Sequence, residues 1–318
     1  MINILTNKTK YALQIHTKGL KDEIIKRAQS RYDNSNTSLS RLDYRILLTF
    51  IKGNSQDIIS KELTGLRQLQ NRLFNLLPNS QDLEEDLEYI FNYKLFRKFK
   101  KIKYNGFRLA KNLNIEVCPY CNRNYTTSHR VDGESKNVYP EFDHYLPRST
   151  YPLLALSFYN LIPSCNICNT HYKGSEDPLV RNLYYPYSNY EAIKYFNFGF
   201  TPSDSDAILG KSNNLSIDIE TAKYSSTPLI RLQVDNSLNF FNILEIYTKN
   251  HKALIMDVIN KRITYSDNYI KQLENNYGLT FEDAYRVIFE TYYEETKLMK
   301  RPFSKLKRDI FIELKELT

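Results

Sequence analysis

The spacing of apolar residues predicts that the first third of the chain is helical. Apolar positions recur three and four residues apart over Leu20–Arg31 and Leu42–Ile51, which is typical of amphipathic helices. The same spacing continues over Ser60–Leu77 and ends before Pro78, which favours a turn. The next predicted helix, over 82–103, begins with acidic residues and ends with basic ones. That order complements the helix dipole.

Turn signals and alternation predict a β-hairpin in the middle of the chain. The segments Asn124–Arg130 and Lys136–Phe142 flank Asp132-Gly133-Glu134, a sequence that favours a tight turn. A short strand at Asn160–Pro163 is expected next, followed by a helix that begins near Cys165.

The pattern changes twice in the last part of the chain. Three prolines between residues 178 and 202 interrupt any helix there. Leu215–Thr221 and Leu229–Val234 both alternate, which predicts a second hairpin. Helical spacing then returns over three segments: Leu238–Ile259, Ser266–Asn275 and Phe281–Lys300. We expect these helices to pack against the N-terminal ones.

All four cysteines lie in two C-x-x-C pairs, Cys118/Cys121 and Cys165/Cys168. Each pair points two sulfurs to one side of a tight turn, so two pairs can form the closed tetrahedral site that structural Zn²⁺ prefers. Disulfides are the alternative, but four cysteines in 318 residues without a signal-peptide core do not favour them. A redox C-x-x-C would need only one pair. We therefore expect a structural zinc site whose formation depends on the metal.

Asp143-His144 lies between the cysteine pairs, followed by Asn160 and Asn169. Hydrolysis of a phosphodiester needs a base for the water and a Lewis acid for the leaving oxygen. His144 can be the base, while Asp143 and Asn169 offer the hard oxygens that suit Mg²⁺ or Mn²⁺. Asn160 is better suited to bracing the loop after His144. An isolated Asp-His pair would usually be a surface turn, but its place between two zinc knuckles argues against that reading.

The segment Cys118–Lys173 resembles the HNH endonucleases, which have a ββα-metal core with flanking zinc knuckles. It reads DHYLP, NL and CNTHYK where the family has D-H-x-x-P, N-L and C-N-x-x-x-K. The resemblance implies that His144 is the general base, that Asp143 and Asn169 bind the catalytic metal, and that Asn160 acts by bracing the loop. Some members carry a metal-binding histidine where Lys173 stands. We expect Lys173 to contact phosphate instead.

These observations predict an α+β protein in three parts. A helical N-terminal lobe is expected at 1–115, a ββα-metal HNH core with structural zinc at 116–176, and a mixed, then helical C-terminal lobe at 177–318. The chain has no run of 18 apolar residues and no signal-peptide core. We therefore expect a cytoplasmic protein that does not span a membrane.

Charge favours nucleic acid as the partner. The net charge is +8 and the isoelectric point is near 9.0. A basic stretch interleaved with aromatic residues precedes the first cysteine pair. It can bind phosphates or simply form a solvated face. Its candidate phosphate contacts, called the basic ridge below, are Lys98, Lys100, Lys101, Lys103 and Arg108.

Long HNH chains with helices on both sides of the core are similar to the nuclease subunits of bacterial anti-phage systems such as Septu and certain retrons. The partner there is an ATPase, and this chain has no phosphate-binding G-x-x-x-x-G-K-[ST] loop of its own. The sequence thus predicts a metal-dependent endonuclease, with DNA as the expected substrate. Two alternatives stay open, a ribonuclease on the same core and a zinc-stabilised nucleic-acid-binding module without catalysis. A zinc deaminase is disfavoured because its H-x-E and P-C-x-x-C signature is absent.

Overall fold

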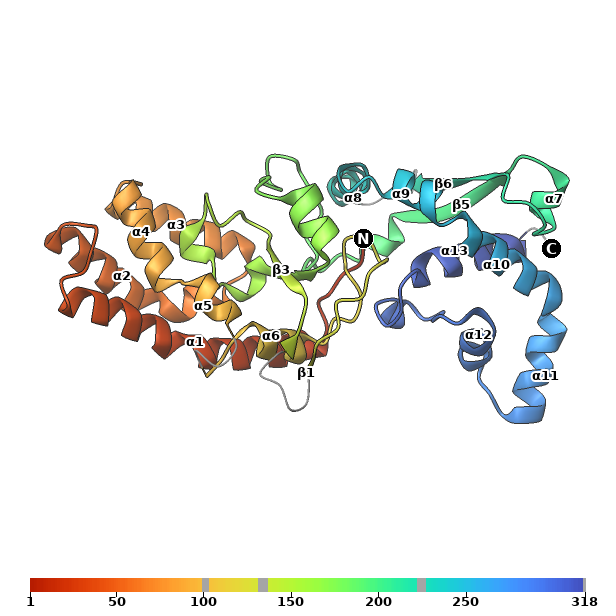
Figure 1. Cartoon of the computed structure of the whole chain (residues 1–318), viewed down its shortest axis with the longest axis horizontal. Helices are drawn as coiled ribbons and strands as arrows, with labels where there is room; N and C mark the ends of the chain where they lie inside the picture. The colour runs from red at the N-terminus through yellow and green to blue at the C-terminus, as the bar shows by residue number, and fades with distance from the viewer. Residues whose placement is uncertain (99–102, 131–136, 222–226, 317–318) are drawn as a thin grey trace.

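The computed structural model describes residues 1–98, 103–130, 137–221 and 227–316. Within these ranges the chain is rich in helix and carries small antiparallel sheets, which agrees with an α+β fold. Figure 1 shows an elongated molecule with β3 (Glu141–His144) between two groups of helices. The expected packing of the C-terminal helices against the N-terminal ones is not observed, because the two groups lie at opposite ends.

Polar caps divide the N-terminal lobe into short helices. Ser40 and Ser80 accept hydrogen bonds from the backbone N–H groups of Asp43 and Leu83, which satisfies donors that a helix start leaves unpaired. The helices of this lobe are α1 (Asn7–Asp33), α2 (Arg41–Ser60), α3 (Leu63–Leu76), α4 (Gln81–Ile90), α5 (Tyr93–Arg97) and α6 (Gly106–Leu113).

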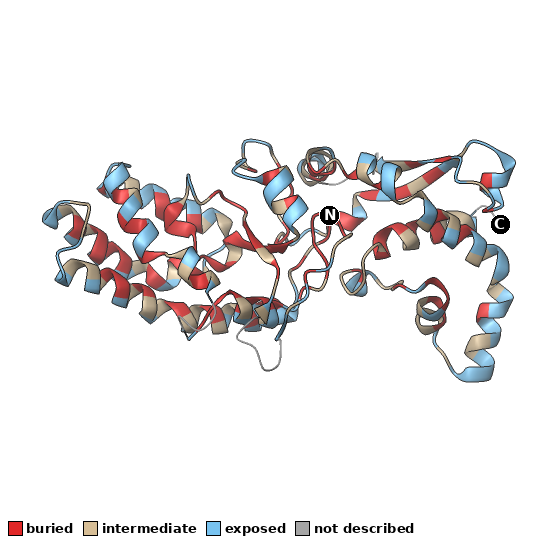
Figure 2. Cartoon of the chain, in the orientation of Figure 1, coloured by how far each residue is buried: buried red, intermediate tan, exposed pale blue. Residues whose placement is uncertain are grey.

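The helix predicted over 82–103 is broken. Its first part, α4, ends at Ile90, and Asn92 then caps α5 by accepting a hydrogen bond from the N–H of Leu95. The buried face of the lobe lies between its helices (Figure 2), where Leu20 and Ile24 of α1 are fully buried. Residues 99–102 lie outside the described part of the chain.

The middle of the chain folds as two strands followed by a helix. Strand β3 pairs antiparallel with β4 (Leu161–Ser164), which places Asp143 opposite Ile162. The segment between the strands is buried except around Arg148–Tyr151 and at Tyr159, and it contains two 3₁₀ turns, η1 (Pro152–Leu154) and η2 (Phe158–Asn160). The helix that follows is the π-helix η3 (Ile167–Lys173). The predicted strand and helix at these places are confirmed.

The hairpin predicted over Asn124–Phe142 is correct only in part. Its arms pair over two residues each, as β1 (His129–Arg130) and β2 (Asn137–Val138). Strand β3 leaves this hairpin and pairs with β4 instead. The strand that carries Asp143 and His144 therefore belongs to a sheet whose second strand lies after a long buried connection.

The C-terminal lobe combines one hairpin with several helices. Strand β5 (Phe196–Pro202) pairs antiparallel with β6 (Leu215–Thr221), and α13 packs on β5. The remaining elements are η4 (Ala192–Lys194), α7 (Ser205–Ile208), α8 (Pro228–Phe240), α9 (Ile243–Asn250), α10 (Lys252–Thr264), α11 (Asp267–Tyr277), α12 (Phe281–Phe289), η5 (Glu295–Lys297) and α13 (Ser304–Glu316).

Three predictions for this lobe need correction. The segment Leu229–Val234 is part of helix α8 and not a strand, so β6 pairs with β5. The helix predicted over Leu238–Ile259 is divided among α8, α9 and α10. The helix predicted over Phe281–Lys300 ends at Phe289, because Glu290 takes a left-handed conformation with φ +57°.

The three-part division at residues 115 and 176 stays a prediction. One cluster of buried apolar residues runs from the N-terminal helices through the cysteine segment to α13, so packing alone does not separate the parts. Among the helices of the described ranges, none is both long enough and apolar enough to cross a bilayer.

Candidate active site and metal centres

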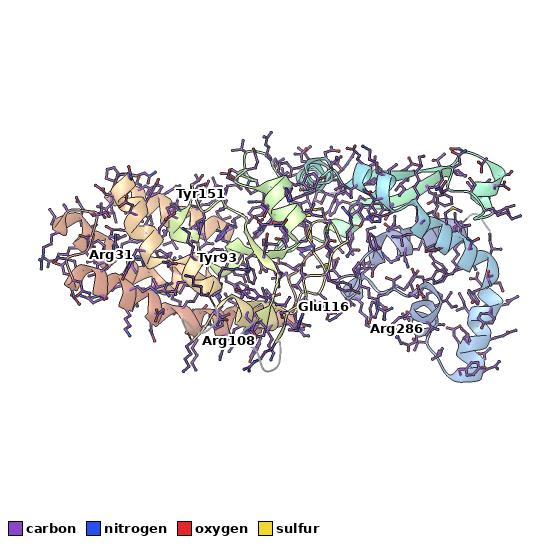
Figure 3. All side chains as sticks on the ribbon, viewed as in Figure 1. Arg31, Tyr93, Arg108, Glu116, Tyr151 and Arg286 are labelled. Atoms are coloured by element: carbon purple, nitrogen blue, oxygen red, sulfur yellow. The ribbon has the colours of Figure 1, made fainter. Side chains whose placement is uncertain are left out.

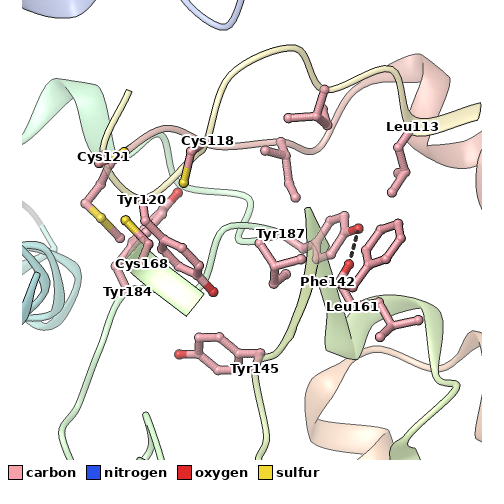
Figure 4. Packing of buried hydrophobic residues seen from close by; sticks show 14 of the residues in the cluster. Leu113, Cys118, Tyr120, Cys121, Phe142, Tyr145, Leu161, Cys168, Tyr184 and Tyr187 are labelled. Atoms are coloured by element: carbon pink, nitrogen blue, oxygen red, sulfur yellow. Dashed lines mark hydrogen bonds between the residues drawn. The ribbon is translucent and has the colours of Figure 1, made fainter. Parts of the chain in front are cut away.

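The four cysteines gather into one site. Their sulfur atoms all lie within 4.8 Å of one another, and Sγ of Cys121 is 3.9 Å from Sγ of Cys165. Cys118, Cys121 and Cys168 are buried and Cys165 is half-buried. Figure 4 shows the side chains of the buried three close together among other buried residues of the apolar cluster. The predicted clustering is confirmed, and four thiolate donors fit a tetrahedral Zn²⁺.

Backbone hydrogen bonds shape the first cysteine turn. The N–H of Cys118 donates to the carbonyl of Asn124, and the N–H of Asn122 donates to the carbonyl of Cys118, both at 2.9 Å. Asn122 is left-handed, with φ +52°, a conformation that asparagine tolerates. Burial raises the pKa of the Cys118 thiol, so a bound cation is what would stabilise its thiolate.

Asn122 also joins this turn to the C-terminal lobe. Its carbonyl accepts from the N–H of Phe303 (2.7 Å) and its Oδ1 from the N–H of Lys305 (3.2 Å). Its Nδ2 donates to the carbonyl of Leu298 (3.0 Å). The side chain is buried, so these bonds form a dry connection between the cysteine site and the start of α13.

A cleft of about 470 Å³ opens between β3 and the residues that directly follow η3. It brings together three residues that the sequence singled out, Asp143, His144 and Asn169. The cleft also contains residues that the sequence analysis did not name, and those bearing charge or an aromatic ring include Tyr93, Arg97, Glu141 and Arg148.

His144 is half-buried and held by one ring nitrogen. Its Nε2 lies 3.0 Å from the carbonyl oxygen of Ala155. A carbonyl only accepts, so Nε2 carries the proton and Nδ1 keeps its lone pair. The ring of Tyr93 on α5 meets the imidazole edge-on, with centroids 4.4 Å apart. Figure 3 shows Tyr93 on the side of the N-terminal lobe that faces β3.

The imidazole of His144 is neutral over the working range of pH. Burial, helped by the nearby charges of Arg148 and Lys173, lowers its pKa to about 3. The hydrogen bond to the carbonyl of Ala155 opposes this shift without cancelling it. A neutral ring whose Nδ1 keeps its lone pair can accept a proton, but a pKa this low makes it a weaker base than a histidine that titrates near neutrality.

Asn160 is fully buried and uses its whole amide to hold the loop after His144. Its Oδ1 accepts from the N–H of Leu146 at 2.7 Å. Its Nδ2 donates to the carbonyls of Leu146 and Leu154, both at 3.1 Å. Both ends of the amide are thus committed to the loop, and Asn160 is a positioning residue in this structure.

Asp143 is buried and both of its carboxylate oxygens are engaged. Oδ2 accepts from the hydroxyl of Tyr120 at 2.6 Å, and Oδ1 lies 2.9 Å from Nζ of Lys173. Tyr120 stands inside the first C-x-x-C turn, so this contact ties the cysteine site to strand β3. An ammonium group at the carboxylate opposes a divalent cation. Asp143 therefore does not fit the role of metal ligand in this arrangement.

The expectation that Lys173 contacts phosphate is wrong for this structure. Only 2% of the residue is exposed, and besides Asp143 its Nζ donates to the carbonyl of His144 at 2.7 Å. A lysine buried in this way compensates a buried carboxylate and fixes the strand next to the base. The motif that the segment resembles does not state whether the side chain at this position points inward.

Asn169 is half-buried and borders the cleft. Its Nδ2 donates to Oε2 of Glu141 at 2.7 Å, so its Oδ1 remains available. Glu141 also accepts from Asn166 at 2.9 Å and from Thr170 at 3.2 Å. Partial burial acts to raise the pKa of Glu141, but the three hydrogen bonds together outweigh it and hold that pKa below its ordinary value. Glu141 and Asn169 thus present hard oxygens that fit Mg²⁺ or Mn²⁺.

Glu141 could have been noticed in the sequence from its spacing to Asp143, because residues two apart in a strand share a face. Arg148 follows four residues after His144, and its guanidinium lies 5.6 Å from the ring of Tyr93. Tyr93 could not have been found from spacing, because it reaches the site from α5 in the helical lobe.

The basic ridge is only partly described. Lys98, Lys103 and Arg108 are exposed, as phosphate contacts should be, and Lys100 and Lys101 lie outside the described residues. Arg108 belongs to α6, which packs beside α1 (Figure 3). None of the three described ridge residues borders the cleft that holds His144. The assignment of the ridge to nucleic acid stays a prediction.

Comparison with known proteins finds one partial similarity. A stretch of 85 residues is 40% identical to the Septu protein PtuB of Bacillus thuringiensis. The match covers 26% of this chain and 29% of that protein, so it spans under a third of the relative's length. No family model matches the chain. No solved structure matches it at a significant level.

Proposed function

We propose that this protein is a metal-dependent endonuclease of the HNH type that hydrolyses phosphodiester bonds in DNA. The observation that carries the proposal is the state of His144. The ring is neutral, Nε2–H is bound to the carbonyl of Ala155, and the ring borders a cleft that also contains Asn169 and two arginines. A base, hard oxygen ligands and cations in one cleft are the groups that phosphodiester hydrolysis needs.

The first step is proton transfer from the attacking water to His144. Nδ1 accepts the proton, while Nε2 keeps its own and stays bound to the carbonyl of Ala155. That bond and the edge contact with Tyr93 prevent the ring from turning away. A positioned base of this kind contributes a factor of about 10²–10⁴ in rate.

A divalent cation in the cleft would polarise the phosphate and stabilise the leaving oxygen. Oδ1 of Asn169 is the protein oxygen best placed to hold it, since its amide nitrogen is already fixed on Glu141. The resemblance to HNH enzymes assigns the carboxylate ligand to Asp143, but in this structure that carboxylate is paired with Lys173 and Tyr120.

Zinc at the four cysteines has a structural role in this proposal. The first cysteine turn reaches strand β3 through the Tyr120–Asp143 hydrogen bond, and η3 begins beside the second pair and carries Asn169. The metal would therefore fix both elements that form the cleft.

The biological setting proposed is bacterial defence against phage. The 85-residue similarity to a Septu protein supports this setting, together with the resemblance to nuclease subunits of such systems. The chain carries no phosphate-binding loop for ATP, so we propose that an ATPase encoded beside it is its partner.

The deciding experiment is cleavage of plasmid DNA and of tRNA, with and without Mg²⁺, by the zinc-loaded protein. His144→Ala should abolish cleavage and leave nucleic-acid binding intact. His129→Ala is the matched control, because His129 is exposed and does not border the cleft. Cleavage of tRNA but not plasmid would identify a ribonuclease. Binding without any cleavage by the wild type would identify a non-catalytic module.

A further inference from the structure

Two carboxylates share one face of β3 but have opposite surroundings. Glu141 and Asp143 are two residues apart in the strand, so both side chains point toward η3. Asp143 is 1% exposed, whereas Glu141 is half-buried and borders the open cleft. A cation from solvent can therefore reach Glu141 without any rearrangement of the protein.

The surroundings of Asp143 form a closed set of charges and hydrogen bonds. Its oxygens meet Nζ of Lys173 (2.9 Å) and the hydroxyl of Tyr120 (2.6 Å), one on each oxygen. Lys173 is itself buried and bridges to the carbonyl of His144. If a cation took Asp143, the buried ammonium would lose its counter-charge next to a double positive charge, which is strongly unfavourable.

Hydrogen bonds hold the carboxylate of Glu141 in a fixed orientation, as is common for a carboxylate that binds a metal ion. Its two oxygens accept three hydrogen bonds, from Asn166, Asn169 and Thr170 of the segment that forms η3. An ionised carboxylate offers about four acceptor positions, so one remains for a cation. Neutral donors of this kind orient a ligating carboxylate without competing for its charge.

We propose that Glu141, and not Asp143, is the carboxylate that binds the divalent cation in this cleft, together with Oδ1 of Asn169. Mg²⁺ and Mn²⁺ sites in phosphoryl-transfer enzymes need only one or two protein ligands, because water and substrate phosphate complete the shell. Asp143 is then a positioning residue that holds the backbone of His144 through Lys173. The proposal rests on the proposed function only for the role of the cation.

The test is direct Mn²⁺ binding to the zinc-loaded full chain, measured by the electron paramagnetic resonance signal of free Mn²⁺. Glu141→Gln keeps the size of the side chain and an acceptor for Asn169 while it removes the charge. We expect Mn²⁺ affinity to fall at least tenfold. Glu176→Gln is the matched control, because this carboxylate is exposed, pairs with Arg181 and lies outside the cleft lining. It should bind as the wild type does.

The second variant is the double substitution Asp143→Asn with Lys173→Gln, which leaves no unpaired charge behind. We expect its Mn²⁺ affinity to stay within threefold of the wild type. Wild-type affinity in Glu141→Gln would overturn the proposal, and so would an equal loss in the double variant. If the double variant does not fold, Glu141→Gln decides alone, because its side chain lies at the edge of the cleft.

Failure of this proposal can be told apart from failure of the proposed function. Mn²⁺ binding is measured without substrate, so it does not depend on cleavage. If cleavage requires His144 but Mn²⁺ affinity is unchanged in Glu141→Gln, the nuclease function is supported and Glu141 is rejected as the metal ligand. If Mn²⁺ binding requires Glu141 but no cleavage is found, Glu141 is supported as the metal ligand and the nuclease function is rejected.

Discussion

His16 shows what burial does to a histidine that has no catalytic surroundings. It is fully buried on α1, where Nε2 lies 2.8 Å from the carbonyl oxygen of Leu156 and Nδ1 has no partner among the described residues. Burial lowers its pKa to about 4. Like His144 it is therefore neutral, but unlike His144 it borders no part of the cleft. A shifted pKa alone does not mark the base; the open cleft does.

Acidification should destabilise the protein because of this residue. Unfolded histidine titrates near pH 6.5 and folded His16 near 4, so between these values the unfolded chain binds more protons. The free energy of unfolding should decrease as pH falls through this window, by up to about 1.4 kcal/mol per pH unit. Urea unfolding at a series of pH values across the window measures this. His144, whose pKa burial also lowers, contributes to the same slope, so His16→Gln should reduce the slope without removing it. An unchanged slope in that variant would assign the effect to other groups.

At this scale the sequence predicted which residues would come together better than it predicted their surroundings. Asp143, His144 and Asn169 do meet at one cleft. The contacts of Lys173 could not be predicted, because a motif specifies the residue type and not the direction of its side chain. Whether a lysine faces phosphate or a buried carboxylate depends on packing between β3 and η3, which are not adjacent in sequence.

The cysteine turns are the elements whose loss should be most costly. We expect about one zinc per chain, as four thiolates around one ion imply. Cys118→Ser should remove the zinc and destabilise the surrounding segment, because three thiolates no longer form the closed four-thiolate site that Zn²⁺ prefers. Metal content by mass spectrometry and thermal unfolding by circular dichroism measure both effects. A zinc-free variant with wild-type melting behaviour would rule out a structural zinc.

The basic ridge makes a prediction about binding and not about catalysis. Reversal of Lys98, Lys103 and Arg108 to glutamate should weaken duplex DNA binding. It should also reduce the slope of log K against log salt concentration by about 0.9 for each phosphate that the variant no longer binds. The control variant changes three exposed lysines of the C-terminal lobe to glutamate: Lys211, Lys249 and Lys271. It changes the net charge by the same amount. An unchanged slope would mean that the ridge does not bind phosphate.

The errors in predicted elements have local causes. Leu229–Val234 alternates like a strand, but Pro228 at the first helical position starts α8, and Leu229 stays 59% exposed. Asn92 interrupts a continuous helical pattern because its side chain caps α5. A prediction from the spacing of apolar residues gives too little weight to single capping residues. The arm predicted over Lys136–Phe142 overlaps β3 only at Glu141 and Phe142. Its predicted partner is wrong because the pairing with β4 depends on residues far along the chain.

The whole molecule offers much more surface than its central cleft requires. The helical lobes lie on either side of the β3 sheet (Figure 1), and the proposed nuclease carries no recognisable base-reading motif in its sequence. A nuclease without such selectivity would harm its host if it were always active. We therefore expect regulation by a partner that binds one of these lobes.

The protein expressed alone should be weakly active or inactive at physiological Mg²⁺. Co-expression with an ATPase, the partner proposed above, should change both cleavage and toxicity to the host. Plasmid cleavage and colony counts measure this, with His144→Ala in the same complex as the control for contaminating nucleases. Strong cleavage by the isolated protein would remove the need for a partner and leave the nuclease assignment unaffected.

The contacts of Asn122 also set an order of events during synthesis. The ribosome releases Cys118–Lys173 long before Phe303 and Lys305, which cap the left-handed turn at Asn122. At elongation rates of about 5–20 residues per second the intervening stretch takes on the order of ten seconds. During that interval a nascent chain holds every cysteine and every cleft residue of β3 and η3, but the first cysteine turn lacks its buried cap. The start of α13 is thus the last part of the described chain to join the buried hydrogen bonds at Asn122.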